Sequence, residues 1–273
     1  WQLAVGTPFN WRIGKNDASE RHQLREMIDE TPADTLFAMD AGFTGYDLLR
    51  QIVDGGRHFL VRVGKHVELL RELGDYTCED DQTVYLWPAR ERNRNHPPLV
   101  LRLVCVRKPG KQPVYLLTSV CDARRLSDKK CAKLYRLRWE VELGYRALKQ
   151  TLEKRKLCSK SAINAIFEMQ GLLLGLMVLS MTSVAAITQA GHKPLDLSFA
   201  EALRHVRRHL GRHRRVDWSH RLADAVKDQY KRRRKTRRDW PRKKQNDPPP
   251  GPPRQRRATR SERQSYAALL LTK

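Results

Sequence analysis

The sequence predicts an α/β fold, because patterns typical of short strands and of amphipathic helices alternate along the first part of the chain. Residues 1–14 have the composition of two short strands around a Gly-Thr-Pro turn. Helix and strand patterns then alternate twice, and the apolar runs 36–40 and 58–64 are the strands. This order predicts a sheet with helices packed on it, and we assign residues 1–64 to the first part of its core.

The middle of the chain has a different pattern. Residues 65–125 contain β-rich runs separated by Gly, Pro and charged turns, which predicts a mostly antiparallel insertion. Helical periodicity returns over residues 127–157, 163–189 and 198–210. We therefore assign residues 126–210 to helices that complete the core.

The charge of the chain points to a polyanion such as nucleic acid. There are 54 Lys and Arg against 30 Asp and Glu, a formal net charge of +24. Residues 201–273 hold 24 of these cations and only 7 of the acids. Because Pro and Arg dominate residues 211–273, we expect this segment to be a basic, disordered tail.

Two features favour a cytoplasmic protein without a membrane partner. The five cysteines form no C-x-x-C motif and are odd in number, which is typical of reduced thiols. The apolar run 171–187 is interrupted by Ser and Thr and is the single run of its kind, so we interpret it as a buried core helix. His205, His209 and His213 recur at helical spacing, but they lie among arginines and indicate a basic face rather than a metal site.

Four residues of the segment 126–157 have the spacing Y-x2-R-x3-E-x6-K, and they are Tyr135, Arg138, Glu142 and Lys149. On a regular α-helix these offsets fall within roughly a 60° arc. One helical face would then present an aromatic ring, a carboxylate and two cations. That combination suits a phosphodiester and a metal ion better than it suits a protein core.

A second candidate acid, Asp40, ends the apolar run LFAMD and precedes a glycine turn. An acid at the carboxyl end of a strand in an open α/β sheet lies where ligands usually bind. The alternative is an Asp that only caps the turn or helix that follows it. The residues alone leave both interpretations of Asp40 open.

Together, the segments MDAGFTGYDLL and HFLVRV and the Y-x2-R-x3-E-x6-K spacing resemble DDE-type transposases of bacterial insertion sequences, in the group with the Tyr-Arg-Glu-Lys signature. The resemblance runs from about residue 1 into the basic tail. It implies a ribonuclease-H-like mixed sheet with flanking helices and a β-rich insertion between the second and third acids, which residues 65–125 match. It also implies metal-dependent DNA strand cleavage and strand transfer at transposon ends.

The resemblance implies a role for each candidate residue. Asp40 would be the second catalytic acid and Glu142 the third, and both would be ligands of divalent metal, normally two Mg²⁺ ions in a complete site. Arg138 and Lys149 would contact DNA phosphates near the cut, and Tyr135 would pack beside a flipped nucleotide.

Two further residues and the partners follow from the same resemblance. Arg62, on the strand after Asp40, is a weaker candidate for contact with DNA. Trp87 either supports a flipped base or packs in the core, and the sequence leaves both possibilities open. The expected partners are double-stranded DNA, at the transposon ends and the target, and a second copy of the chain in a homodimer.

The first acid of the family has no clear counterpart. Asp17 has the pattern of a helix cap, and Asp29 and Asp34 flank a helix end, so none lies on a convincing strand. We therefore expect strand one, with its acid, to precede Trp1, and we expect this chain alone not to cleave DNA. A non-catalytic nucleic-acid-binding remnant and a metal-dependent nuclease of the same fold are the alternatives.

Overall fold

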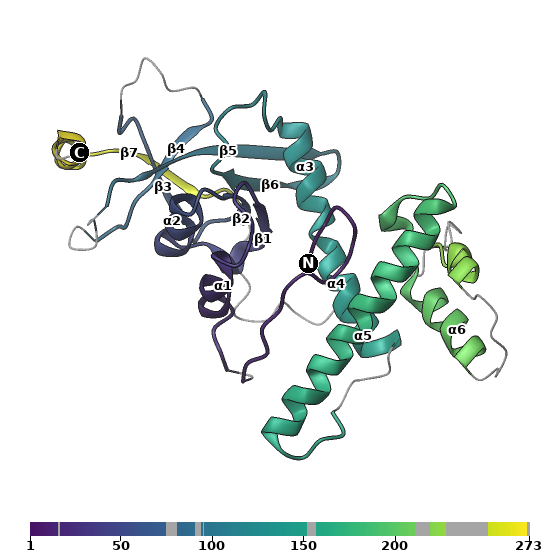
Figure 1. Cartoon of the computed structure of the whole chain (residues 1–273). Coiled ribbons are helices and arrows are strands. Elements are labelled where there is room, and N and C mark those ends of the chain that lie inside the picture. Colours follow the sequence, from purple (N-terminus) through teal and green to yellow (C-terminus); the bar gives the residue numbers. More distant parts are fainter. Residues whose placement is uncertain are drawn as a thin grey trace. The chain divides into compact units, whose positions relative to one another are not determined.

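A computed structural model of the 273-residue chain describes residues 1–15, 17–74, 81–90, 94, 96–151, 157–210, 219–227 and 251–271. The chain forms two compact units (Figure 1). The sheet unit comprises Ala18–Arg136 and Arg242–Lys273, and the helical unit comprises Trp1–Asp17 and Leu137–Pro241. The larger segment of the helical unit, Leu137–Pro241, thus lies in sequence between the two segments of the sheet unit, and Trp1–Asp17 precedes both.

The sheet unit is built on one seven-stranded mixed sheet of order β1-β2-β6-β5-β4-β3-β7. Two pairs, β1 with β2 and β3 with β7, are parallel, and the other neighbours are antiparallel. The strands are β1 (Leu36–Met39), β2 (His58–Val63), β3 (Glu68–Arg71), β4 (Thr83–Leu86), β5 (Leu99–Lys108), β6 (Lys111–Thr118) and β7 (Arg254–Arg257). This sheet and its flanking helices confirm the predicted α/β fold class.

The helices of the sheet unit are α1 (Glu20–Ile28), α2 (Tyr46–Asp54), α3 (Asp128–Leu137) and α7 (Arg260–Leu271). α2 begins after Gly45 and ends at Gly55, and the following Gly56 has φ +70°, a conformation that favours glycine. Its buried residues Leu48, Leu49 and Ile52 lie on one helical face, which explains why this segment packs on the sheet.

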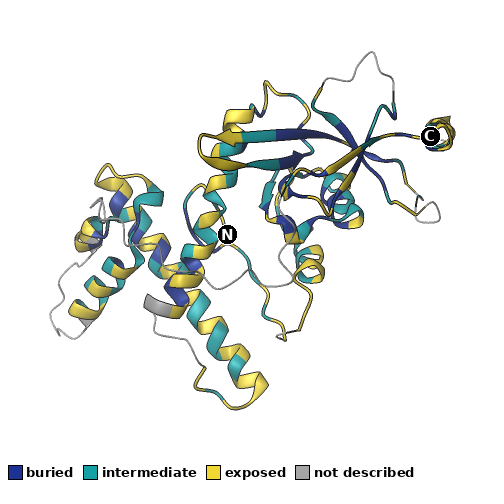
Figure 2. Ribbon diagram, turned by 180° about the vertical axis from the view of Figure 1, so that it is seen from behind, coloured by how far each residue is buried: buried dark blue, intermediate teal, exposed yellow. Residues whose placement is uncertain are grey.

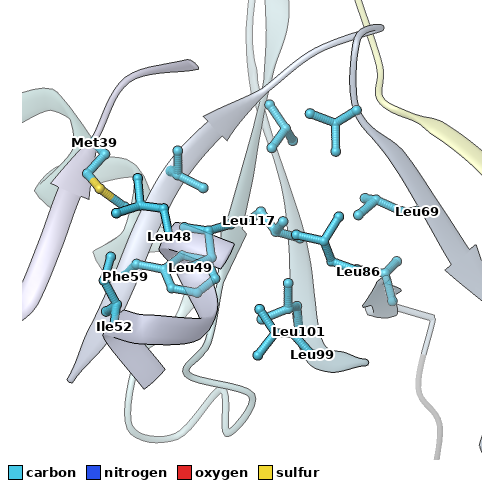
Figure 3. Close-up of a cluster of buried hydrophobic side chains, with 14 of the residues drawn as sticks. Met39, Leu48, Leu49, Ile52, Phe59, Leu69, Leu86, Leu99, Leu101 and Leu117 are labelled. Atoms are coloured by element: carbon cyan, nitrogen blue, oxygen red, sulfur yellow. The ribbon is translucent and has the colours of Figure 1, made fainter. Parts of the chain in front are cut away.

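The core lies on both faces of β2. Leu48, Leu49 and Ile52 of α2 form one cluster with Phe59 of β2 and Leu117 of β6 (Figure 3). A second cluster combines Leu60 of β2 and Leu116 of β6 with Leu126 and Cys131 beside and on α3. Successive side chains of a strand point to opposite faces, so helices cover both sides of β2 and its sequence is almost continuously apolar.

The β-rich segment 65–125 joins the same sheet. Strands β3, β4 and β5 each pair antiparallel with the next strand in the sequence, which for β5 is β6. At one end of this series β6 pairs antiparallel with β2, and at the other end β3 pairs parallel with β7. The predicted strands of this segment therefore extend the core sheet rather than form a separate one. The domain boundaries that we placed at residues 64 and 125 stay predictions.

Part of the expected tail is ordered. Residues 251–271, which we expected to be disordered, include β7 and α7, and β7 pairs with β3 from Glu68↔Arg254 to Arg71↔Arg257. Composition missed this strand because the sequence RQRR has no apolar pattern, while its backbone bonds to Val67 and Arg71 do not depend on side chains. The rest of the segment, residues 211–218, 228–250 and 272–273, lies outside the described residues.

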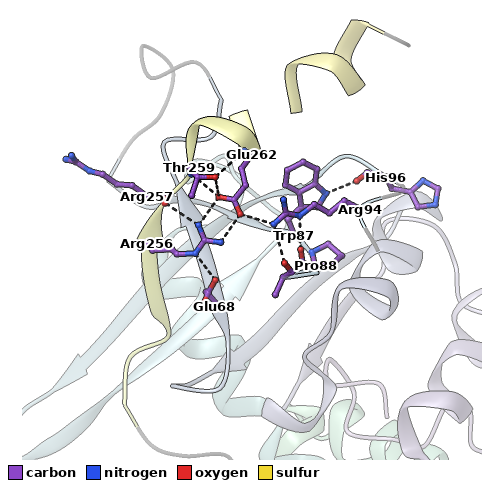
Figure 4. Close-up of polar contacts among 10 residues, drawn as sticks. Glu68, Trp87, Pro88, Arg94, His96, Arg256, Arg257, Thr259 and Glu262 are labelled. Carbon is purple, nitrogen blue, oxygen red and sulfur yellow. Dashed lines mark hydrogen bonds and ion pairs between the residues drawn. The ribbon is translucent and has the colours of Figure 1, made fainter. Parts of the chain in front are cut away.

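A buried carboxylate holds this C-terminal segment in place. Both oxygens of Glu262 are bound: Oε1 accepts from Arg94 and from Arg256, each at 2.8 Å, and Oε2 accepts from Arg256 at 2.8 Å (Figure 4). Glu262 Oε2 also accepts from the Thr259 N–H at 2.9 Å, and Thr259 Oγ1 accepts from the Glu262 N–H, which is a capping box at the start of α7. Arg256 reaches Glu68 of β3 at 2.8 Å, so the network connects α7, β7 and β3.

The helical unit contains α4 (Trp139–Arg146), the π-helical turn η4 (Ala147–Thr151), α5 (Ala162–Gln189) and α6 (Phe199–Leu210). The two strands that we predicted for residues 1–14 are wrong, because this segment has one isolated bridge, Gln2↔Thr7, and belongs to the helical unit. Trp1 instead packs with Ala147, Leu148 and Leu176, and its ring meets that of Phe199 at 6.2 Å.

α5 contains the apolar run that we interpreted as a core helix. It begins at the N-cap Ser161 and has buried positions at Leu176, Ser180, Ser183 and Ile187. Met181 (57% exposed) lies between these positions and Phe167 (71% exposed) lies nearer the start of the helix, so only part of α5 is buried (Figure 2). By length and composition α5 could cross a membrane, which is weak evidence when it comes from one helix among the described residues.

Because of the Glu262 network, we expect the folded chain to lose stability as the pH falls into the acid range. Hydrogen bonds from Arg256, opposed by desolvation and helped by Thr259, lower the pKa of Glu262 from 4.5 to about 2. A lowered pKa stabilises the folded chain above pH 4.5 by about 3 kcal/mol, and this is lost as the pH falls toward 2. We expect Glu262→Gln to lower the free energy of unfolding in urea near pH 7, and the difference from wild type to shrink between pH 5 and pH 2.

The matched control for this measurement is Glu72→Gln. Glu72 pairs with Arg257, whose side chain is 80% exposed, so solvent screens this ion pair. We expect little change at any pH. A difference between wild type and Glu262→Gln that stays constant from pH 7 to pH 2 would contradict the role given to the Glu262 charge.

Candidate active site

Asp40 directly follows β1, at the carboxyl end of that strand. It is the N-cap of the 3-10 turn η1 (Ala41–Phe43), and its Oδ1 accepts a hydrogen bond from the Gly42 N–H at 2.7 Å. Asp40 is exposed, and its Oδ2 has no hydrogen-bond partner within the described part of the chain. The two interpretations of Asp40 are thus compatible, because one oxygen caps the turn and the other faces solvent.

Arg62 lies next to this end of β1. The parallel register pairs Met39 with Val61, so Arg62 is level with the residue that follows β1. Strand alternation places the Arg62 side chain on the same face of the sheet as Leu60, the face that α3 covers. It is exposed, which leaves its guanidinium accessible to a ligand such as phosphate.

Tyr135 belongs to the sheet unit and has a packing role. Its half-buried ring lies on α3 against the cluster that contains Leu60, Val104 and Leu116. This contact explains the aromatic residue without any ligand. It also leaves part of the ring exposed, as base stacking would need.

The other three signature residues belong to the helical unit. Glu142 lies in the first turn of α4, and its Oε1 is 3.6 Å from Arg138 Nη1. The Glu142 side chain is 47% exposed, so this ion pair is weak and open to exchange. Lys149 lies in η4 and is exposed.

The single regular helix that we predicted over residues 127–157 is wrong. α3 ends at Leu137 and α4 begins at Trp139, with Arg138 between them, and η4 then replaces the regular α-helical spacing. A π turn has i→i+5 bonds, so it changes the angular position of Lys149 relative to Glu142. The 60° arc calculated from the sequence therefore does not describe these four residues.

Glu140, two residues before Glu142, has a structural role. Its Oε2 is 3.5 Å from Lys227 Nζ, and the Glu140 side chain is only 18% exposed. Lys227 also donates to the Leu195 carbonyl at 2.6 Å. These contacts support the choice of Glu142, rather than Glu140, as the candidate acid of α4.

Trp87 is buried, at 5% exposure. Its Nε1–H donates to the His96 carbonyl at 2.8 Å, and the Arg94 guanidinium lies 4.7 Å from the ring centroid (Figure 4). The ring also meets the edge of Tyr266 at 6.4 Å. Of the two possibilities left open for Trp87, the structure favours the packed tryptophan.

None of the upstream aspartates ends a strand in the described residues. Asp29 is the C-cap of α1 and lies 3.7 Å from Arg57. Asp34 precedes β1 with φ 61°, and Asp17 lies at the end of the first segment of the helical unit. As the sequence indicated, none of the three lies on a strand, and the identity of the first acid stays a prediction.

Divalent metal fits the candidate acids in ligand type. Mg²⁺ prefers carboxylate oxygens, and the accessible oxygens of Asp40 and Glu142 are of that kind. Among the described residues, no group of three or more His, Cys, Asp or Glu side chains could hold a metal ion. Asp40 and Glu142 belong to different units of the chain.

Sequence reasoning missed two residues beside Asp40. Arg21 of α1 donates from Nε to the Gly42 carbonyl, and His66 Nε2 lies 3.1 Å from Thr44 Oγ1. Neither residue belongs to a motif, and both are far from Asp40 in sequence. Only the folded arrangement identifies them.

Comparison with known proteins identifies the family of this chain. The family described as the transposase DDE domain matches residues 3–178, which contain Asp40 and Glu142. The chain is 33% identical over 210 residues to the transposase InsG for insertion sequence element IS4 of Escherichia coli (strain K12), covering 72% of this chain and 46% of that protein. It is 24% identical over 169 residues to a putative transposase for insertion sequence element IS4SA of Synechocystis sp. (strain ATCC 27184 / PCC 6803 / Kazusa), covering 60% of this chain and 46% of that protein.

The chain therefore belongs to the DDE transposase family of bacterial insertion sequences, which is a family of enzymes. This confirms the resemblance found in the sequence. The chain spans a little under half the length of these two relatives, 46% in each case.

Proposed function

We propose that this chain is part of a DNA transposase that cleaves DNA strands at transposon ends and transfers them to a target, with divalent metal as cofactor. The observation that carries the proposal is the position of Asp40 at the carboxyl end of β1, within the segment that matches the family and that also contains Glu142. Ligands of open α/β sheets bind at this end of the strands.

Asp40 and Glu142 would hold the metal through their accessible oxygens. When bound, two Mg²⁺ ions supply activation of the attacking water or DNA 3′-hydroxyl and stabilisation of the leaving oxygen. Asp40 keeps Oδ1 on the Gly42 N–H, which leaves Oδ2 for the ion. Glu142 would exchange its weak pairing with Arg138 for the ion, because both side chains of the pair are at least partly exposed.

The cations would bind the DNA backbone. Once Glu142 binds metal, Arg138 would exchange this ion pair for a contact with a phosphate, and Lys149 and Arg62 are exposed for the same role. The exposed part of the Tyr135 ring would stack on an unpaired base. Double-stranded DNA and a second copy of the chain are the proposed partners, and the cytoplasm is the proposed location.

Activity would need one more acid than the described residues offer as a candidate. The described residues offer two candidate acids, and an incomplete cluster cannot position two metal ions. The same observation favours a second candidate function, a non-catalytic nucleic-acid-binding remnant of a transposase. The high positive charge would allow such a chain to bind any phosphate backbone.

We expect the isolated 273-residue chain to bind duplex DNA but not to cleave it in the presence of Mg²⁺. Binding should weaken steeply with salt, because Lys and Arg contacts release counterions from DNA. Gel-shift and nicking assays on the same DNA measure both properties. Robust Mg²⁺-dependent cleavage by this chain would show that its acids suffice and would rule out the remnant.

In a full-length transposase that contains this chain, we expect Glu142→Gln to reduce strand cleavage without weakening DNA binding. Loss of an outer-shell partner of a metal ligand already costs about 10–100-fold, so loss of a ligand should cost more than about 100-fold. The control is Glu140→Gln, which alters only the contact with Lys227. If Glu142→Gln cleaves at the wild-type rate, Glu142 is not the catalytic acid.

We expect Arg138→Ala in the same protein to weaken binding to transposon-end DNA and to make that binding less sensitive to salt. Removal of one phosphate contact reduces the slope of log K against log salt by about one. Fluorescence anisotropy across a salt series measures the slope. An unchanged slope with weaker binding would indicate that Arg138 only orients Glu142.

A further inference from the structure

The direction of the Asp40 carboxylate depends on the turn that follows it. Asp40 Oδ1 accepts from the Gly42 N–H at 2.7 Å, and the Asp40 carbonyl accepts from the Phe43 N–H at 3.1 Å. A Cβ at position 42 would lie 3.2 Å from Asp40 Oδ1, so glycine allows this close approach. Because glycine is also the least restricted residue, the turn needs contacts from elsewhere to keep one conformation.

Arg21 supplies the first of these contacts. Its Nε–H donates to the carbonyl of Gly42, the residue whose N–H binds Asp40. Gly42 is therefore held on both sides, by the Asp40 carboxylate and by a guanidinium from α1. A hydrogen bond from a charged donor is stronger than one from a neutral donor, which makes Arg21 an effective anchor even at the surface.

His66 supplies the second contact, from the turn between β2 and β3. The buried Thr44 hydroxyl donates to the Ala41 carbonyl at 3.1 Å, and Thr44 Oγ1 lies 3.1 Å from His66 Nε2. A hydroxyl has one proton, so His66 Nε2–H is the donor in this second bond. Desolvation, opposed by a hydrogen bond to Ala41 and aided by the charge of Arg21, lowers the pKa of His66, which agrees with a neutral ring.

We propose that Arg21 and His66 are positioning residues that fix the backbone of residues 41–44, and thereby aim Asp40 Oδ2 at its ligand. The two side chains come from separate elements, and they bind different residues of the same turn: Arg21 binds Gly42, and His66 binds Thr44. The aim toward a metal ion rests on the function proposed above. The restraint of the turn does not, because it follows from contacts within the sheet unit alone.

The test is amide hydrogen exchange of Gly42 and Phe43, measured by NMR on the intact chain without metal. These two N–H groups bind Asp40 directly, so their protection reports the turn. We expect the double variant Arg21→Ala/His66→Ala to exchange at these amides about tenfold faster or more, with the amides of β2 unchanged, because loss of local contacts permits local opening. Equal exchange in the double variant and wild type would overturn the proposal.

Two further variants separate positioning from general stability. Arg25→Ala changes the same helix one turn later, where Arg25 Nε donates to Gln51 Oε1 at 3.0 Å, and it should leave both amides protected. His66→Gln keeps a donor near the position of Nε2 and should restore protection lost in His66→Ala. If Arg25→Ala accelerates exchange as much as the double variant does, or if His66→Gln restores nothing, the proposed contacts are not the cause.

A final comparison in the full-length transposase keeps the two proposals distinguishable. Arg21→Ala/His66→Ala should raise the Mg²⁺ concentration needed for half-maximal cleavage severalfold, and His66→Gln should restore it. If the exchange results hold but Asp40→Asn cleaves normally, the turn is restrained as proposed and the proposed catalytic role of Asp40 is wrong. If Asp40→Asn is inactive but exchange is unaffected by the double variant, the catalytic role stands and the positioning role is rejected.

Discussion

Strand β2 is the constraint on which the sheet unit depends. It is bonded to β1 on one side and to β6 on the other, and both of its faces are covered by buried side chains. Phe59, Leu60 and Val61 are fully buried, so three successive residues serve both core clusters. A polar or small side chain at Phe59 or Val61 would weaken the cluster with α2, and one at Leu60 would weaken the cluster with α3, because interiors are close-packed.

The position of Asp40 in the candidate site depends on the pairing of β1 with β2. The parallel register with β1 determines where β1 ends, and Asp40 begins its turn at that point. The next turn of the chain, after β2, carries His66 back to the Asp40 turn. A single buried strand thus determines the position of a candidate acid and of one of the residues that we propose restrain it.

The sequence predicted elements whose signal is local. The strands LFAM and HFLVRV were identifiable because burial demands apolar runs there, and Asp40 was a candidate because ligands of open α/β sheets bind at the carboxyl ends of strands. β7 could not be predicted, since its four residues carry no apolar pattern and it is stabilised by pairing with β3 and by Glu68 of that strand, which is distant in sequence. The break in the helix at Arg138 and the π turn η4 could not be predicted from the sequence either. Ala147 and Leu148 of that turn pack against Trp1, the first residue of the sequence, and periodicity cannot predict such a long-range contact.

The pairing of β7 with β3 has a consequence for folding during synthesis. Residues Leu137–Pro241 of the helical unit separate these two strands in the sequence, so the sheet stays incomplete until that segment and β7 have left the ribosome. At about 5–20 residues per second, the interval is on the order of ten seconds. During this interval β3 is an unpaired edge strand, and such a strand can pair with a strand of another chain. The charge of Glu68, at the start of that edge, disfavours such pairing until Arg256 of β7 forms its ion pair with Glu68.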